Sequence, residues 1–280
     1  MNKILIIDGH NLLFQMFFGM PARIINKDGK AIQGTLGFVG ALLKIIKMVT
    51  PTHTVVLFDG ERHNPRTDLD PNYKANRIDY DSVPDDENPF TQLLDIYNAL
   101  DFLGIKHCET TVCETDDVIA AYALKYGIDN EIVISSFDSD FFQLITEKVK
   151  VLRYRGENTA IYDNKLFSEK FGILPKYYAD YKSLTGDSAD NIKGADKIGP
   201  KTAAALVSEF GSLENIIANC DNITKPAIQK SVSESAERLR LNYKLIKLCD
   251  CSEIPFTLDE IEYNYNGITT TEVLVGIGLK

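Results

Sequence analysis

The sequence has no long hydrophobic run. None of its apolar stretches approaches the roughly 18 residues that a membrane-spanning helix needs, so we expect no membrane partner. The first apolar stretch already contains Asp8 and lacks a small-residue cleavage site, which argues against a signal peptide. We therefore expect a cytoplasmic protein.

Cysteine is scarce and poorly placed for binding a metal. No Cys-x-x-Cys pair with a neighbouring histidine completes a zinc site. An odd number of cysteines in a chain without a secretion signal predicts reduced thiols. The five cysteines are Cys108, Cys113, Cys220, Cys249 and Cys251.

Positive charge is also in short supply, since 30 Lys and Arg face 40 Asp and Glu for a net charge of −10. Taken alone, this balance argues against nucleic-acid binding, because affinity for phosphate comes largely from Lys and Arg. A protein that holds divalent cations must concentrate carboxylates, however, and these lower the total. The useful question is whether acids and bases are segregated locally.

The hydrophobic pattern predicts an α/β fold. Short continuous runs of Val, Ile and Leu at residues 3–7, 54–58 and 131–135 indicate buried strands. Helical spacing at residues 36–49, 90–103 and 116–126 separates them. Strands that alternate with helices imply a central, mostly parallel sheet with helices on both faces.

The strand pattern fades from about Lys176 onward, where helical segments and glycine turns take over. We therefore divide the chain into an α/β part at residues 1–174 and a helical lobe with a C-terminal tail at residues 175–280. Within the first part, residues 61–89 are poor in aliphatics and too long for an ordinary connection, so we expect this insert to be functional or mobile.

Acidic residues follow the expected strands. Asp8, Asp59 and the pair Asp138 and Asp140 come at or just past strand ends, and ligands bind at that edge of a parallel sheet. A single aspartate there is usually a helix cap or a turn residue. Several on one edge favour a binding site.

Two more acidic groups follow along the chain. Glu114, Asp116 and Asp117 lie within four residues. Capping of the following helix explains one or two of them, whereas close carboxylates repel and a cation relieves the repulsion. Asp187 and Asp190 are three residues apart, which suits one helical turn or a tight loop and also fits a loop cap.

Hard oxygen ligands without His or Cys select Mg²⁺ or Mn²⁺ over zinc. Two such ions roughly 3.5–4 Å apart clamp the attacking and leaving oxygens of a phosphoryl displacement. This chemistry requires no Ser-His-Asp triad. The acidic residues therefore predict a two-metal phosphodiesterase.

Basic residues in the insert are candidates for contacting DNA. They include Arg62 and Arg66, and also Lys74 and Arg77, which would share one face of a helix. Lys74 and Arg77 could reach a scissile phosphate, and Tyr73 could stack on a base. The insert also carries as many acids as bases, so a solvated loop of mixed charge stays an alternative.

A glycine-rich turn precedes an expected helix at residues 201–210. Pro200 suits the first position of that helix, whose free backbone N–H groups would form an anion site for a DNA phosphate. A plain helical hairpin is the alternative. The expected DNA-binding residues of this segment are Lys193, Gly194, Lys197, Gly199, Lys201 and Thr202.

In this order, the motifs resemble the flap endonuclease/5′-3′ exonuclease family, over about residues 3–250. The family includes the N-terminal nuclease domain of bacterial DNA polymerase I and stand-alone bacterial and phage 5′-nucleases. The motifs that carry the resemblance are Ile-Ile-Asp8-Gly9-His10-Asn11, Leu-Phe-Asp59, Tyr73-Lys74-Ala75-Asn76-Arg77, Glu114-Thr-Asp116-Asp117, Asp138-Ser-Asp140 and Gly186-Asp187-Ser-Ala-Asp190-Asn191, which leads into residues 194–203.

The resemblance implies a PIN-like fold with a helical arch at about residues 61–89 and a helix-three-turn-helix at about residues 183–218. Lys74 matches the lysine that contacts the scissile phosphate, with Arg66 and Arg77 beside it. We expect Lys74, Arg77, Asp8 and Asp140 to be catalytic. The acids that match the metal site are Asp8, Asp59, Glu114, Asp116, Asp117, Asp138, Asp140, Asp187 and Asp190.

The resemblance also implies cofactors and partners. It predicts two or more Mg²⁺ ions, replaceable by Mn²⁺, and a K⁺ ion held by backbone carbonyls of the helix-three-turn-helix. The expected substrate is DNA with 5′ flaps, nicks or free 5′ ends, cut during replication and repair. We expect a monomer associated with the bacterial nucleoid.

The sequence departs from the family at two positions. Gln15 stands where an arginine is usual, which would remove one phosphate contact, and Phe137 replaces a small or hydroxylated residue. No polymerase follows Lys280, so we expect a stand-alone nuclease.

Three other functions fit parts of the sequence. A haloacid-dehalogenase-type phosphatase needs an early Asp-x-Asp, but here that motif comes late, at Asp138. A PIN-domain ribonuclease would not explain the glycine turn or the arch motif. A degenerate, purely DNA-binding relative would have lost metal ligands, whereas all the acids are present.

Overall fold

The computed structural model describes residues 1–61, 63–249 and 254–280, so Arg62 and Cys251 lie outside the described residues. Within these ranges one sheet has the strand order β3-β2-β1-β4-β5-β6. Strands β1 to β5 are parallel and β6 is antiparallel to β5, which confirms the expected mostly parallel sheet. The strands are β1 (Lys3–Asp8), β2 (His53–Asp59), β3 (Lys106–Thr110), β4 (Glu131–Ser135), β5 (Val149–Arg153) and β6 (Ala160–Tyr162).

Strand β1 lies at the centre of the sheet, between β2 and β4. Its residues from Ile4 to Ile7 are completely buried, because helices cover both faces of a parallel sheet. The chain runs outward from β1 to β2 and β3 on one side, and to β4 and β5 on the other. This reversal creates a crevice at the carboxyl ends of β1 and β4, where ligands bind in such folds.

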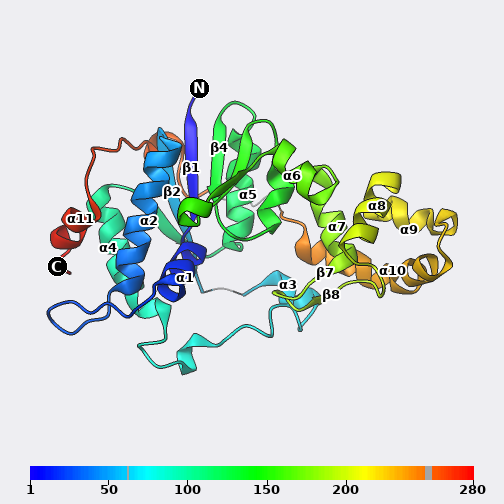
Figure 1. Ribbon diagram of the computed structural model, residues 1–280, viewed down its shortest axis with the longest axis horizontal. Coiled ribbons are helices and arrows are strands. Elements are labelled where there is room, and N and C mark those ends of the chain that lie inside the picture. Colours follow the sequence, from blue (N-terminus) through cyan, green and yellow to red (C-terminus); the bar gives the residue numbers. More distant parts are fainter. Residues whose placement is uncertain (62, 250–253) are drawn as a thin grey trace.

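Alternate residues of β1 enter two separate cores. Leu5 and Ile7 pack with helices α1 (Gly9–Gly19), α2 (Gln33–Val49) and α4 (Leu93–Leu103). Ile4 and Ile6 pack with α5 (Thr115–Tyr126). Figure 1 shows α1, α2 and α4 on one side of the sheet and α5 on the other. The period-2 alternation of a strand therefore fills both layers.

The sequence pattern missed β5, β6 and the edge strand β3. The residues of β3, Lys-His-Cys-Glu-Thr, include no Val, Ile or Leu. An edge strand needs a partner on one side only and tolerates such polar residues, and β3 pairs only with β2. The expected helix at residues 90–103 begins at Leu93, because a 3₁₀ helix at Pro89–Gln92 precedes it.

The second lobe is helical, as expected. Helices α7 and α10 pack together, and α8 and α9 lie at the far end of the molecule (Figure 1). A short hairpin of β7 and β8 follows α7. Helix α6 (Asn164–Phe171) precedes this lobe, whose elements are α7 (Tyr178–Thr185), β7 (Gly186–Asp187), β8 (Ile192–Lys193), α8 (Pro200–Phe210), α9 (Leu213–Ala218) and α10 (Pro226–Ile246).

The insert is not the helical arch that the resemblance implied. Within residues 61 and 63–89, an α-helix forms only at α3 (Pro65–Leu69) and a 3₁₀ helix at Tyr80–Ser82; the chain otherwise runs as turns beneath α1 (Figure 1). Lys74 itself has a left-handed φ of 57°. The prediction that Lys74 and Arg77 share a helix face is therefore wrong, because the prolines and Asx turns of this segment break helices.

The C-terminal segment returns to the α/β part. Glu262 forms a β-bridge with His53, and the backbone of Phe256 exchanges hydrogen bonds with the Tyr122 hydroxyl. Helix α11 (Thr270–Gly276) contacts α2 and α4, at the opposite end from α8 and α9 (Figure 1). Across the described ranges, no helix combines the length and apolarity of a membrane span.

Cys113 is disulfide-bonded, so the prediction of reduced thiols is wrong for this residue. Cys108, Cys220 and Cys249 are free. An odd cysteine count does not exclude a single bond, and chain folding brings together residues that sequence spacing does not relate.

Candidate active site

Asp8 ends β1 and lies at the crevice. Its Oδ1 accepts a hydrogen bond from the Asn11 backbone at 3.1 Å, which caps α1, and its Oδ2 accepts one from the Ser136 hydroxyl at 2.7 Å. Asp8 is therefore a helix cap, and its carboxylate also lines the cavity at the sheet edge.

The other strand-end aspartates are fixed by their neighbours. Asp59 accepts from both the backbone and the hydroxyl of Thr115, at 3.1 and 3.0 Å. Asp138 follows β4 and accepts from the Asp140 backbone at 2.8 Å. These bonds orient the carboxylates before any ligand binds.

An open cavity of about 870 Å³ joins these residues. Asp8, Asp59, Asp116 and Asp138 all line it, and so does Lys74. The sheet therefore gathers acids that are far apart in the sequence, as the strand-end argument predicted. Asn11 and His10 line the same cavity; sequence reasoning had assigned no role to either side chain.

The electrostatics of this cavity favour a cation. Burial, together with the charges of Asp59 and Asp138, raises the pKa of Asp8 to about 7. Burial and the neighbouring Asp138 raise the pKa of Asp116 well above its usual value. Carboxyl groups that resist ionisation side by side become stable anions when a divalent cation balances them. Oxygen donors without His or Cys fit Mg²⁺ or Mn²⁺.

Glu114 and Asp117 are not among the residues that line the cavity. Asp117 binds the Arg66 guanidinium through both oxygens, at 2.7 and 2.9 Å, and also accepts from the Cys249 backbone. Glu114 accepts from Arg66, from Asn64 and from the Lys74 ammonium at 2.7 Å. Hydrogen bonds to other side chains and to the backbone therefore occupy these carboxylates.

Arg66 and Tyr73 are buried, and neither is among the residues that line the cavity. Arg66 is 7% exposed and Tyr73 is 5% exposed. Tyr73 packs with Ala179, Ile192 and Leu245, and the Lys74 ammonium lies 4.9 Å from its ring centroid. Both side chains, which the sequence analysis expected to contact DNA, are therefore buried in this structure.

Lys74 and Arg77 do reach the cavity. Burial opposes the charge of Lys74, but Glu114 overcomes that effect and raises the pKa of the ammonium above its ordinary value. The Arg77 guanidinium donates to Asp190 at 2.9 Å and remains about half exposed. Both side chains therefore line the same cavity, although the turn that carries them is not helical.

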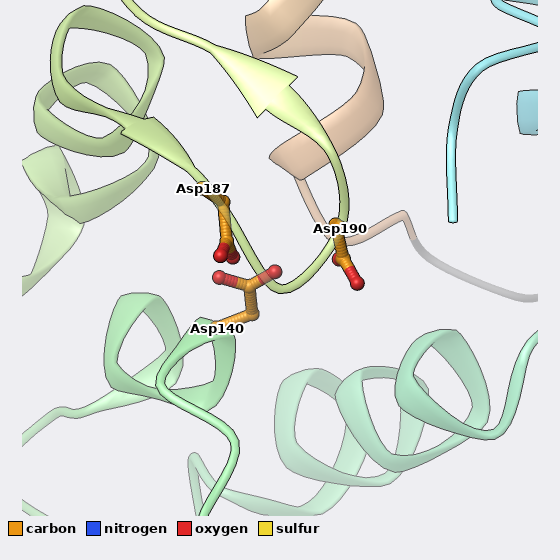
Figure 2. A group of neighbouring side chains, drawn as sticks. All are labelled: Asp140, Asp187 and Asp190. Atoms are coloured by element: carbon orange, nitrogen blue, oxygen red, sulfur yellow. The ribbon is translucent and has the colours of Figure 1, made fainter. Parts of the chain in front are cut away.

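A second acidic cluster lies beside the first. Asp140, Asp187 and Asp190 bring oxygens within 4.8 Å of one another. In Figure 2, Asp187 and Asp190 approach from the β7–β8 hairpin toward Asp140, which begins the 3₁₀ helix Asp140–Leu144 after β4. Burial raises the pKa of Asp140 to about 7. Burial also acts on Asp187, but the Lys182 ammonium outweighs it and lowers the pKa of that carboxyl.

Lys182 is the residue of this site that the sequence analysis missed. Its ammonium binds Asp140 and Asp187 from inside helix α7. The sequence around it, Tyr-Ala-Asp-Tyr-Lys-Ser-Leu-Thr, mixes apolar and polar residues, so it gave no clear signal that this lysine is buried.

The glycine turn has the expected local geometry. A Cβ on Gly194 would lie 2.3 Å from the backbone of Thr185, so only glycine fits where the hairpin meets α7. Lys193, Lys197 and Lys201 are exposed. Helix α8 begins at Pro200 without a side-chain cap on Gly199, so its first N–H groups are available to an anion.

The two departures from the family lie together at the ends of β4 and β5. The Gln15 amide donates to the carbonyl of Tyr154, and Gln15 is not among the cavity-lining residues. Phe137 packs beneath Arg153, with 5.9 Å between the guanidinium and the ring centroid. Neither residue replaces an acid of the site.

Two family models match the chain. The 5′-3′ exonuclease N-terminal resolvase-like domain matches residues 3–172, and the 5′-3′ exonuclease C-terminal SAM fold matches residues 173–268. A 5′-3′ exonuclease from Buchnera aphidicola is 33% identical, over 88% of this chain and 86% of that protein.

Thermostable DNA polymerase I from Thermus filiformis is also 33% identical, but the chain spans only 29% of its length. The bacteriophage T5 flap endonuclease, solved in a pseudo-enzyme-product complex with DNA and metal ions, has a TM-score of 0.67 and 25% identity over 88% of this chain and 89% of that one. The chain belongs to the 5′-3′ exonuclease family.

Proposed function

We propose that the chain is a structure-specific 5′-nuclease that cuts DNA at 5′ flaps, nicks and free 5′ ends by a two-metal mechanism. One observation carries this proposal. Arg77 lines the first cavity and binds Asp190 of the second cluster, so it lies between the two acidic groups. A phosphodiester at that point would meet Arg77 and Lys74 on one side and both acidic clusters on the other.

The acids divide into two sets by their surroundings. Asp8, Asp59, Asp116 and Asp138 would hold one ion, because they share a cavity. The set Asp140, Asp187 and Asp190 would hold the other. We propose Mg²⁺ as the natural ion and Mn²⁺ as a substitute. Such ions supply an activated water and stabilise charge on the leaving oxygen.

Glu114 and Asp117 have a different role in this proposal. Glu114 orients the Lys74 ammonium through a 2.7 Å bond. Asp117 fixes Arg66, which in turn holds Glu114. These acids thus position a catalytic cation, and any ion they contact would be reached through water.

Lys74 and Arg77 would bind the scissile phosphate. Fixed cations aimed at developing negative charge are effective in a site that is partly shielded from water. Arg77 would leave Asp190 to do so, because a guanidinium forms bidentate bonds with a phosphate.

The helical lobe would hold the duplex. Exposed lysines at positions 193, 197 and 201 surround the uncapped start of α8, and backbone N–H groups there suit a phosphate without reading bases. Gly194, Gly199 and Thr202 would allow the close approach of the backbone. We further propose a K⁺ ion on the carbonyls of this turn, a lobe boundary near residue 174, and a monomer that acts at the bacterial nucleoid.

A 5′-labelled flap substrate tests the proposal directly. With Mg²⁺ or Mn²⁺ the protein should release short 5′ products, and without divalent ions it should not. Asp140→Asn and Asp190→Asn should abolish cleavage, while duplex binding in Ca²⁺ largely survives. Wild-type protein that leaves the flap intact would refute the activity, and undiminished cleavage by both variants would refute the residue assignment.

A further inference from the structure

Lys182 lies inside the second acidic cluster. Its side chain is 7% exposed, and its ammonium binds Asp140 and lies 2.5 Å from the Asp187 carboxylate. The Ser139 hydroxyl is the next polar neighbour, at 3.4 Å. The lysine therefore approaches the oxygens that Figure 2 shows facing one another.

Helix α7 contains one other buried charged residue, Asp180, and its carboxylate accepts a hydrogen bond from the Leu213 backbone. Tyr178, Ala179, Tyr181 and Leu184 are all buried in the same helix. A lysine among such residues retains its charge only beside carboxylates, since an unpaired buried charge is costly. The acids need the lysine for the same reason, because their oxygens lie within 4.8 Å of one another.

Each acid of the cluster has a basic partner. Lys182 forms ion pairs with Asp140 and Asp187, and Arg77 forms one with Asp190. A divalent ion would use the same oxygens as the Lys182 ammonium. The ion and the ammonium would therefore compete for these two carboxylates, because two cations that share the same ligand oxygens also repel each other.

We propose that Lys182 is a built-in counter-ion that competes with the divalent ion for Asp140 and Asp187. In the metal-free protein its ammonium holds the two carboxylates together. Entry of the ion displaces the ammonium toward Ser139, so this cluster binds metal more weakly than its acids alone would. The inference rests on the proposed function only in taking this cluster as a metal site.

A titration of the DNA-free protein with Mn²⁺ tests whether Lys182 competes with the ion. Electron paramagnetic resonance measures the concentration of free Mn²⁺ at each step. Lys182→Met keeps the length of the side chain and removes its charge. The variant should bind Mn²⁺ at this cluster about tenfold more tightly, equivalent to about 1.4 kcal/mol. It should also melt at a lower temperature in EDTA and gain more from added Mg²⁺ than wild type does.

Lys230→Met is the matched control, because Lys230 is exposed and pairs with Glu234 on α10. It removes the same charge and should leave Mn²⁺ affinity unchanged. A Lys182→Met variant with equal or weaker affinity than wild type overturns the proposal. It would show that Lys182 supports the site instead of competing with the ion.

Lys182→Met could fail to fold in EDTA, and the proposal then requires a specific rescue. Millimolar Mg²⁺, or the added substitution Asp187→Asn, should restore folding by rebalancing the charge. If neither does, Lys182 is only a packing residue and the proposal is overturned. These experiments contain no DNA, so their failure is distinct from a wild-type protein that does not cleave flaps.

Discussion

At the scale of single residues, the same side chain often serves structure and chemistry together. Asp8 caps α1 with one oxygen and lines the cavity with its carboxylate. A sequence pattern cannot separate these uses, because both need a short acid at the end of a strand. For Glu114 and Asp117 the contacts in the folded protein show the structural use, because Arg66 binds both carboxylates and Lys74 binds Glu114.

Replacing Lys74 tests its placement at the scissile phosphate. Lys74→Ala should lower the turnover number by about 100-fold or more, because it removes a fixed cation from the reacting group. Its effect on duplex affinity in Ca²⁺ should stay below about tenfold. Single-turnover cleavage and fluorescence anisotropy measure the two effects, with the exposed Lys165→Ala on α6 as the control. Loss of affinity alone would refute this placement.

The raised pKa of Asp8 predicts a pH-dependent stability in metal-free protein. In the folded protein the pKa of Asp8 is about 7, above its ordinary value of 3.8. The protonated form of Asp8 therefore favours the folded state, and the free energy of unfolding decreases as the pH rises from about 4 to about 7. Asp8→Asn retains a helix cap. In EDTA it should gain stability relative to wild type, by up to about 4 kcal/mol, between pH about 4 and about 8.

Urea unfolding at several pH values measures this difference. Asp163→Asn is the matched control, because Asp163 caps α6 outside the cavity. Added Mg²⁺ should reverse the trend for wild type, since an ion stabilises the ionised carboxylate. A difference between Asp8→Asn and wild type that stays constant with pH would contradict the prediction.

At the scale of elements, tight backbone packing sets the position of the β7–β8 hairpin and of the glycine turn that follows it. Gly186 has a φ of +79°, and a Cβ there would lie 2.4 Å from the Gly194 nitrogen. The hairpin therefore closes directly onto α7 and carries Asp187 and Asp190 to Asp140 (Figure 2). Helix α8 then starts on the exposed side of the same turn.

Lysines beside the start of α8 should contribute to duplex affinity and not to chemistry. Lys197→Ala and Lys201→Ala should each weaken binding and reduce the slope of log affinity against log salt by about 1, because each phosphate contact releases a counterion. Turnover at saturating DNA should be unchanged. Anisotropy titrations at several salt concentrations measure this, with Lys230→Ala on α10 as the control. An unchanged slope for both variants would remove α8 from the interface.

The insert shows the limit of element-level prediction. Lys74 and Arg77 were expected on one helix, but they occupy a turn in which Lys74 has a positive φ. They still meet at the cavity, because the Lys74 backbone N–H donates to the Asp190 carbonyl at 3.0 Å. A hydrogen bond between distant segments, and not a shared helix face, therefore brings this turn to the cavity.

At the scale of the whole molecule, the active site and the C-terminal helix lie at separate places. Helix α11 packs on α2 and α4, away from the crevice at the carboxyl ends of β1 and β4. Part of the acidic charge lies in the two clusters. Lys193, Lys197 and Lys201 are exposed near the start of α8, where Asp196 pairs with Lys193 at 3.5 Å.

Leu274 links α11 to the body of the protein and is 2% exposed. Leu274→Ala should lower the free energy of unfolding by about 2–5 kcal/mol through the cavity it leaves. Turnover well below the melting temperature should not change, because the site lies elsewhere. Val275→Ala, at a 55% exposed position of the same helix, is the control. A loss of turnover without a loss of stability would contradict the separation of α11 from the site.

The sequence by itself determined the parallel sheet and the acids at its edge. Continuous runs of Val, Ile and Leu indicate buried strands, and the carboxyl ends of parallel strands lie at the same edge of the sheet. The tertiary structure decided which acids face the cavity, which ones bind cations behind it, and that Lys182 enters the second cluster. Those outcomes depend on burial and on contacts between distant segments, which the local periodicity of a sequence does not predict.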